Sequence, residues 1–187
     1  DGSPSSIDTA IATLREVGGA FTIINGNTAF TSVSLPALET VFGSLTIQSN
    51  TTLEDVSFPS LTLVSGNVSV TGNTNLASLS SPSLIQTGPD GNQAGFSFII
   101  DNNGTNLPAT DDLELEFRCL RDIRVSSFSI QDNPMDCNYA EAMACAPAGI
   151  IDLTPSINDD GASCGTLEPN CLGYTSILAP LNECPAP

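Results

Sequence analysis

The sequence from residue 43 to residue 61 reads GSLTIQSNTTLEDVSFPSL, and the fold can be inferred from it. Residues 45–47 (Leu-Thr-Ile) and 56–58 (Val-Ser-Phe) alternate between apolar and polar types. Such alternation, with β-branched and aromatic residues at the apolar positions, predicts short strands that are buried on one side. Asn50 is typical of a turn, and Pro59 should end the second strand because it cannot donate a hydrogen bond to a sheet.

The same pattern recurs every 23 residues in the flanking sequence. Equivalent positions are Asn27, Asn50 and Asn73; Phe30, Leu53 and Leu76; Val33, Val56 and Leu79; Pro36, Pro59 and Pro82; and Leu38, Leu61 and Leu84. The asparagine column continues at intervals of 30 residues with Asn103 and Asn133. A unit this small cannot bury its apolar side alone, so stacking of successive units is expected. The repeat therefore predicts an all-β parallel β-helix, or leucine-rich solenoid, of about five coils over residues 19–135.

The two ends of the chain differ from the repeats, and we predict that they cap the solenoid. Residues 6–17 begin with a serine suited to a helix N-cap and carry apolar residues on one helical face, which predicts a capping helix within residues 1–18. Residues 136–187 are predicted to form a cysteine-rich C-terminal cap. The six cysteines are Cys119, Cys137, Cys145, Cys164, Cys171 and Cys184. Their spacing does not match a zinc site, so we expect disulfides formed in an oxidising compartment, with the pairing left open.

The composition argues against several classes of function. The chain has 21 acidic and 4 basic residues, no histidine and a formal net charge of −17, and its basic residues are all arginines. Such a chain repels nucleic acids and anionic membranes, because phosphate binding needs Lys or Arg. Without histidine or lysine there is no Ser-His-Asp triad, imidazole metal ligand or Schiff base. We therefore expect no catalytic residue, cofactor or metal, and no partnership with nucleic acid or direct insertion into a membrane.

The repeat pattern of residues 45–61 resembles that of the receptor L-domain family, which includes the L domains of the insulin and EGF receptors and fungal GPI-anchored cell-wall proteins. The gap of three positions from Asn50 to Leu53 differs from that of an ordinary leucine-rich repeat, and BspA-like surface repeats are the nearest rival. The resemblance covers roughly residues 7–135. It implies a right-handed parallel β-helix with a non-enzymatic role in recognition or structure at a cell surface, and it supplies no binding residues.

Small polar residues between the apolar residues of the strands predict an outward ladder of hydroxyl groups. The candidate binding face consists of Thr22, Thr46, Gln48, Ser69, Thr71, Ser97 and Ser129. These side chains either simply face solvent or form a surface that binds ice or a sugar polymer. The ladder does not repeat Thr-x-Thr uniformly, which weakens the ice-binding interpretation.

Asn50, Asn67 and Asn103 begin Asn-x-Ser/Thr sequons, which are acceptors for N-glycosylation in secreted proteins. Asn50 and Asn103 also belong to the asparagine column, so Asn67 is the best candidate of the three.

The remaining charged residues favour structural interpretations. The adjacent acids Asp111–Asp112 and Asp159–Asp160 converge poorly if they lie on strands, because neighbouring strand residues face opposite ways. Turn-like residues 90–92, 101–104 and 159–161 offer oxygen ligands for calcium, but none matches an EF-hand loop. The arginines Arg118, Arg121 and Arg124 lie among acids, which favours local ion pairs over an acidic partner.

These observations predict a secreted, cell-surface or cell-wall module for adhesion, recognition or structural assembly. Its partners would be other extracellular proteins, glycans or copies of itself. The alternatives are an ice-binding β-helix that uses the hydroxyl ladder and a carbohydrate-active β-helix enzyme.

Overall fold

The computed structural model describes residues 11–24, 30–89, 95–107, 113–120 and 122–134, together with the backbone of residues 156–159 and 162–163. The regular elements of these residues are all β-strands, and they form three sheets. Sheet A contains β1 (Glu16–Val17), β4 (Thr40–Val41), β7 (Leu63–Val64), β10 (Gln86–Thr87) and β13 (Asp122–Ile123). Sheet B contains β2 (Phe21–Ile24), β5 (Leu45–Gln48), β8 (Val68–Thr71), β11 (Ser97–Asp101), β14 (Ser127–Asn133), β15 (Ser156–Asp159) and β16 (Ala162–Ser163). Sheet C contains β3 (Ser32–Ser34), β6 (Asp55–Ser57), β9 (Ser78–Ser80) and β12 (Glu114–Glu116).

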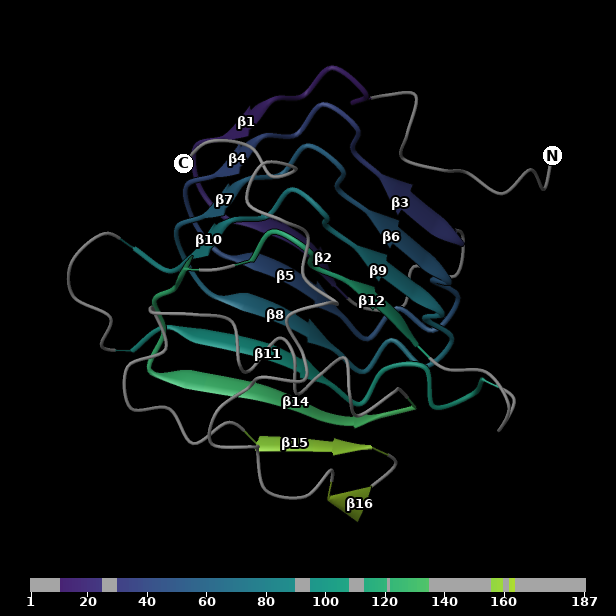
Figure 1. Ribbon diagram of the computed structural model, residues 1–187. Helices are drawn as coiled ribbons and strands as arrows, with labels where there is room; N and C mark the ends of the chain where they lie inside the picture. Colours follow the sequence, from purple (N-terminus) through teal and green to yellow (C-terminus); the bar gives the residue numbers. More distant parts are fainter. Residues whose placement is uncertain are drawn as a thin grey trace, which may run out of the picture.

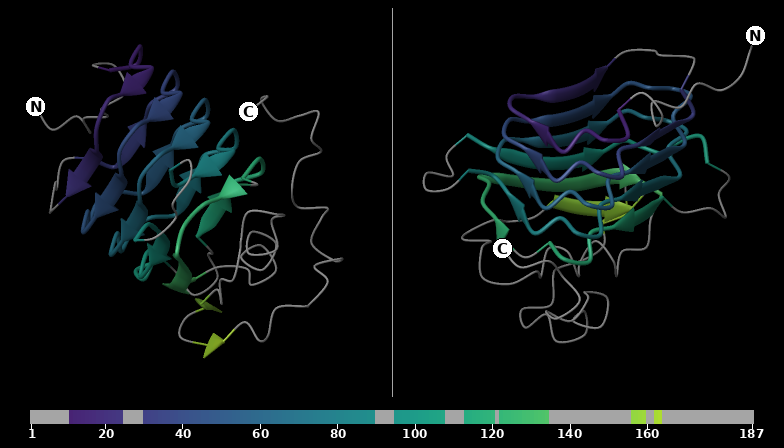
Figure 2. Two further views of the ribbon diagram at one scale, coloured as in Figure 1. Left: turned by 90° about the vertical axis from the view of Figure 1, so that its left-hand side faces the viewer. Right: turned by 90° about the horizontal axis from the view of Figure 1, so that it is seen from above.

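From β1 to β14, successive strands enter sheets A, B and C in turn, and each strand pairs in parallel with the strand one round away. Figures 1 and 2 show these rounds stacked beside one another, with the three sheets as faces around a common interior. This all-β arrangement of parallel sheets is compatible with the predicted parallel β-helix. Sheet B continues past β14, through the parallel strand β15 and the antiparallel strand β16.

The interior consists of apolar side chains from equivalent positions of successive rounds. On sheet C, neighbouring strands place Val33, Val56, Leu79 and Leu115 side by side in that order, and all four side chains are buried. Phe98 stacks on Phe128, with ring centroids 5.1 Å apart and planes 7° from parallel. Full burial of each Val, Leu or Phe side chain contributes about 1.5–3 kcal/mol. The apolar columns in the sequence are therefore the columns of one continuous core.

The predicted N-terminal helix is not found in the part of its range that the structure describes. Residues 11–14 form a turn, in which the Leu14 N–H donates to the Ile11 carbonyl over 2.9 Å. Residues 16–17 form β1, which pairs with β4 so that Val17 lies beside Val41. The helical pattern is overridden because Val17 continues a buried column of the sheet, which tertiary contacts favour over local propensity. Residues 1–10 lie outside the described residues.

Each round turns between sheets at recurring small residues or prolines. After sheet C, the N–H of Leu38, Leu61, Leu84 and Leu120 donates to the carbonyl three residues earlier, over 3.1–3.2 Å. Proline occupies the second position of the first three of these turns, where its fixed φ is favourable. The fourth turn, residues 117–120 (Phe-Arg-Cys-Leu), continues the same column without proline, and the sequence pattern did not reveal it.

Glycine is required between sheets A and B because the backbones of adjacent rounds meet there. A Cβ atom on Gly66 would lie 2.6 Å from the carbonyl carbon of Gly43, and one on Gly43 would lie equally close to that of Gly19. The Gly66 N–H also donates to the Gly43 carbonyl over 3.0 Å, so the two backbones cannot separate without losing this bond.

We predict that Gly66→Ala lowers the free energy of unfolding by about 3 kcal/mol, because the new methyl group is overpacked against backbone. Denaturant unfolding followed by circular dichroism measures the loss. Gly18→Ala is the matched control, since its Cβ meets nothing within 4 Å and should change stability by less than about 0.5 kcal/mol. Equal stability of the two variants would contradict the close approach.

A second prediction concerns Thr87, which is fully buried in the column that contains Val41 and Val64 in earlier rounds. Its Oγ1 has no hydrogen-bond partner among the residues that the structure describes. Thr87→Val should therefore raise the free energy of unfolding by about 1–2 kcal/mol, because a buried unsatisfied hydroxyl is removed at constant shape. Thr62→Val is the control, since the Thr62 hydroxyl donates to the Glu39 carbonyl over 3.0 Å and its removal should give no gain.

Candidate functional surface

The outward side chains of sheet B form two columns, which we call the sheet B face. One column consists of Thr22, Thr46, Ser69, Ile99 and Ser129. The other consists of Ile24, Gln48, Thr71, Asp101 and Gln131. The strands place these side chains outward because their neighbours, such as Ile47 and Val70, fill the core. The face is mostly polar, with Ile24 and Ile99 as its apolar members, and Asp101 is its one carboxylate.

The structure brings the predicted binding residues together on this face, except that Ser97 takes a different position. Ile99 lies between Ser69 and Ser129, and Ser97 pairs with Ser127, one step nearer to the turn from sheet A. Ser97 and Ile99 lie on the same outward side of β11, because Phe98 and Ile100 are buried between and after them, so only the pairing of β11 with β8 and β14 places Ile99 in the column. Alternation in the sequence alone did not distinguish the two positions. The hydroxyl ladder is thus interrupted at Ile99.

Asp101 is the charged residue of the sheet B face. The sequence pattern placed it in a turn-like stretch, residues 101–104, and not on the face of a strand, whereas in the structure it ends β11. Its carboxylate accepts hydrogen bonds from the Ser129 hydroxyl, at 2.9 and 3.0 Å, and from the Gln131 N–H, at 3.0 Å. Burial raises the pKa of Asp101 above its ordinary value of 3.8, the hydrogen bonds from Ser129 and Gln131 oppose this shift, and the charge of Asp132 adds to it. The carboxylate of Asp101 on β11 is therefore held by hydrogen bonds from the neighbouring strand β14. The signal that could have identified it is an acid at an outward strand position.

The raised pKa of Asp101 predicts a pH-dependent stability. Between pH 3.8 and the raised value, the folded state binds more protons than the unfolded chain, so this carboxyl destabilises the fold as the pH rises through that interval. Asp101→Asn keeps an acceptor for the Gln131 N–H and does not ionise. We expect it to be more stable than the parent protein at pH 7, with the gain disappearing below about pH 3.8.

Urea unfolding at pH 7 and pH 3 measures this difference. Glu54→Gln, at an exposed position beside sheet C, is the control for the loss of one negative charge. A gain from Asp101→Asn that is the same at both pH values, or the same as the gain from Glu54→Gln, would contradict the prediction.

Beside the sheet B face, the column of asparagines is buried and forms a continuous hydrogen-bonded ladder. Asn50, Asn73, Asn103 and Asn133 are at most 1% exposed. The Oδ1 atom of Asn73 accepts from both the backbone N–H and the Nδ2 of Asn50, each at 3.1 Å. In the same way, the Oδ1 of Asn103 accepts from the N–H and Nδ2 of Asn73, and the Oδ1 of Asn133 accepts from those of Asn103. Each Nδ2 also donates to a backbone carbonyl of the preceding round.

The three predicted glycosylation sites differ in their relation to the ladder. The side chains of Asn50 and Asn103 are buried in it, and their Nδ2 atoms donate hydrogen bonds. Asn67 lies outside the ladder and is half-buried at the start of β8. Asn27 lies outside the described residues, and the Asn50 Oδ1 has no partner within them.

The residue before each ladder asparagine has a left-handed backbone. Its φ is 58° at Ser49, 66° at Gly72, 56° at Asn102 and 53° at Asp132. These residue types tolerate this conformation better than β-branched residues do. The turn therefore directs each asparagine side chain inward after each strand of sheet B, and the Ser-Gly-Asn-Asp column in the sequence is its signal.

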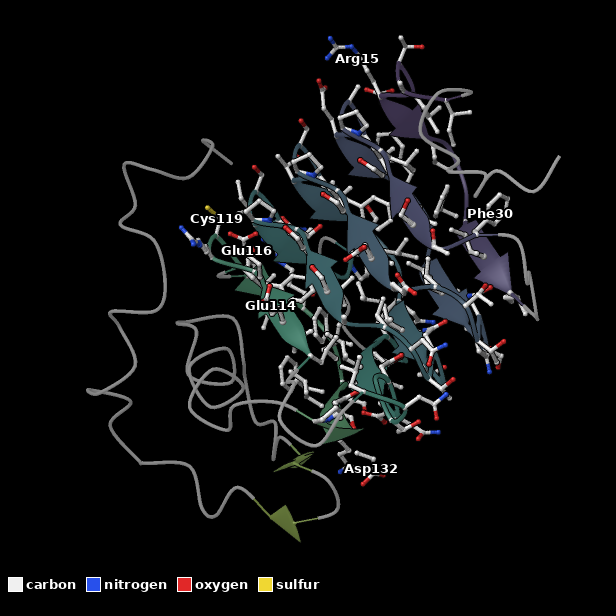
Figure 3. All side chains as sticks on the ribbon, turned by 90° about the vertical axis from the view of Figure 1, so that its right-hand side faces the viewer. Arg15, Phe30, Glu114, Glu116, Cys119 and Asp132 are labelled. Atoms are coloured by element: carbon white, nitrogen blue, oxygen red, sulfur yellow. The ribbon has the colours of Figure 1, made fainter. Side chains whose placement is uncertain are left out.

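The arginines that the structure describes pair with nearby acids. Arg118 contacts Glu116 over 3.0 Å on an exposed surface, and Arg124 donates to both carboxylate oxygens of Asp122. Arg15 pairs with Glu39 at the other end of the molecule. Figure 3 shows Glu114 and Glu116 on the side of sheet C, far from Phe30 in the first round. Arg121 lies outside the described residues.

Cys119 lies in the fourth turn after sheet C, where earlier rounds carry Ala37, Ser60 and Ser83. It is 4% exposed and takes part in a disulfide. The other five cysteines lie outside the described residues, so the disulfide-bonded C-terminal cap remains a prediction. Asp111, Asp112 and Asp160 also lie outside them, and only the backbone of Asp159 is described.

Within the described ranges, no three Cys, Asp or Glu side chains come close enough together to hold a metal ion. Among the same residues, no helix has the length and apolar character needed to cross a membrane. Comparison of the chain with protein-family models, curated proteins and solved structures gave no match.

Proposed function

We propose that this chain is a non-enzymatic extracellular module for adhesion, recognition or structural assembly at a cell surface or cell wall. Its architecture would be a right-handed parallel β-helix of about five coils, similar to receptor L domains, with a disulfide-bonded C-terminal cap. The right hand is expected because connections between parallel strands of one sheet are almost always right-handed. The L-domain resemblance rests on the repeat of residues 45–61, and the three parallel sheets are compatible with it.

The sheet B face is the observation that supports this proposal most directly. Most of its side chains carry a hydroxyl or an amide, and the strands hold them at a fixed spacing over the core. Binding a partner would therefore cost little conformational entropy. Hydroxyl and amide groups both donate and accept hydrogen bonds, as sugar polymers and protein backbones require. We therefore propose glycans, other extracellular proteins or further copies of the chain as the partners of this face.

The two alternatives from the sequence receive no specific support. An ice-binding surface requires a regular hydroxyl ladder, and Ile99 interrupts this one. Catalysis was suggested by acid pairs whose side chains are not among those described.

The proposal is tested with protein made in bacteria, in binding to chitin, β-glucan and cellulose particles and in sedimentation for self-association. We expect one of these probes to bind or the chain to self-associate. Thr46→Arg places a long charged side chain in the middle of the sheet B face and should weaken the interaction at least about tenfold, since it blocks close approach. Ser57→Arg, at the equivalent outward position of sheet C, is the control and should leave it within about twofold.

Both variants should unfold like the parent protein, because the new side chains point away from the core. Equal effects of the two substitutions would contradict the assignment of the sheet B face. A monomer that binds none of the probes would contradict glycan binding and self-association as the role of this face, and hydrolysis of a polysaccharide would contradict a non-enzymatic function.

A further inference from the structure

The geometry points to Asn67 as an N-glycan acceptor and excludes Asn50 and Asn103, although all three begin sequons. This inference rests on the proposed extracellular role, since N-glycans are added in the secretory pathway. It assigns a modification site at the edge of the sheet B face. The evidence is the hydrogen bonding of the three side-chain amides, which differs in kind between Asn67 and the other two.

At Asn50 and Asn103 the Nδ2 atom donates hydrogen bonds within the structure. Asn50 Nδ2 contacts the carbonyls of Ile23 and Gln48 and the Asn73 Oδ1, at 3.1–3.2 Å. Asn103 Nδ2 makes the equivalent three contacts with Val70, Asp101 and Asn133, at 2.9–3.1 Å. A sugar on either atom would replace a donated hydrogen and would need space that does not exist around an asparagine 0–1% exposed.

At Asn67 the fold uses every polar group except Nδ2. Its backbone N–H donates to the Ser44 hydroxyl over 3.1 Å, and its carbonyl accepts from the Leu45 N–H over 2.8 Å. Its Oδ1 accepts from the Ser97 N–H over 2.9 Å. Its Nδ2 makes no hydrogen bond with any residue that the structure describes. An N-linked glycan leaves Oδ1 an acceptor, so the contact with Ser97 survives the modification.

The residues that contact Asn67 from the adjacent rounds are small. The adjacent rounds present Ser44 on one side and Ser97 on the other, both small, and the preceding residue is Gly66. Asn67 lies on the short connection from β7 to β8, beside Ser69 and Thr71 of the sheet B face. A glycan there would border the face, and Thr22 and Thr46 belong to earlier strands of the same sheet.

The reaction is a glycosyl transfer from a polyprenyl-diphosphate-linked oligosaccharide. The Asn67 Nδ2 attacks the anomeric carbon of the first sugar and a nitrogen–carbon bond forms. The bond from that carbon to the diphosphate oxygen breaks, and the polyprenyl diphosphate leaves with the bonding electrons. One Nδ2 proton passes to a base of the transferase, and nothing is oxidised or reduced.

The test expresses the chain behind a signal peptide in a eukaryotic secretory host and analyses the folded, secreted protein. Enzymatic glycan release in heavy-oxygen water converts each occupied asparagine to labelled aspartate, which peptide mass spectrometry locates. We expect label at Asn67 in more than about half of the molecules and none at Asn50 or Asn103. Thermal unfolding of each sample verifies that the protein is folded.

Matched variants separate the sequons without changing the asparagines. Ser69→Ala should abolish the glycan and Ser69→Thr should retain it, whereas Thr105→Ala, at an exposed position, should leave it unchanged. Folded protein that lacks label at Asn67, or that carries label at Asn50 or Asn103, overturns the inference. Such a result would contradict the assignment of Asn67 as the acceptor, because the host secretes the chain in any case. It would not affect the proposed function, which is tested separately on protein made in bacteria.

Discussion

The buried asparagine ladder is the interaction on which the stacking of the rounds depends. Each member binds the backbone and the amide of its neighbour, so a round is held by groups that only an adjacent round supplies. Removing one amide would leave donors and acceptors unsatisfied in two rounds, and each unsatisfied group costs about 1–3 kcal/mol. The ladder therefore couples the turn after sheet B to the register of the sheets. It also explains why the repeat keeps asparagine, where glutamine would be too long and aspartate would offer no donor.

The other turns must also let adjacent rounds stack closely, and they do so without asparagine. Glycine lets the backbones touch between sheets A and B, and proline fits the turns after sheet C because its N–H is not needed. These constraints hold the outward side chains at regular intervals, and the outward side chains can vary because the core and turns do not use them. The sheet B face is a consequence of this division between structural and unconstrained positions, as is the Asn67 Nδ2, to which no described residue is hydrogen-bonded.

Much of the fold could be predicted from the repeat, because a period of 23 residues repeats every structural requirement at the same place. The alternation around Thr46 and Ser57 indicated two of the three strands in each round. The two-residue strands of sheet A were not predicted, since two residues carry too little alternation to recognise. At the first round, the helical pattern of residues 6–17 competed with the strand that Val17 forms, and only the pairing with Val41 resolves that competition.

The sequence by itself determined the apolar columns, the asparagine column and the outward position of the small polar residues, because each follows from local periodicity. The tertiary structure alone decided that Ile99, and not Ser97, occupies the hydroxyl column, since both lie on the outward side of β11 and only the pairing with β8 and β14 distinguishes them. It also decided that Asp101 accepts hydrogen bonds from Ser129 and Gln131, which are far from Asp101 in the sequence. Finally, it separated three sequons into two with buried amides and one whose Nδ2 has no partner among the described residues, because burial is a property of the stacked rounds and not of the tripeptide.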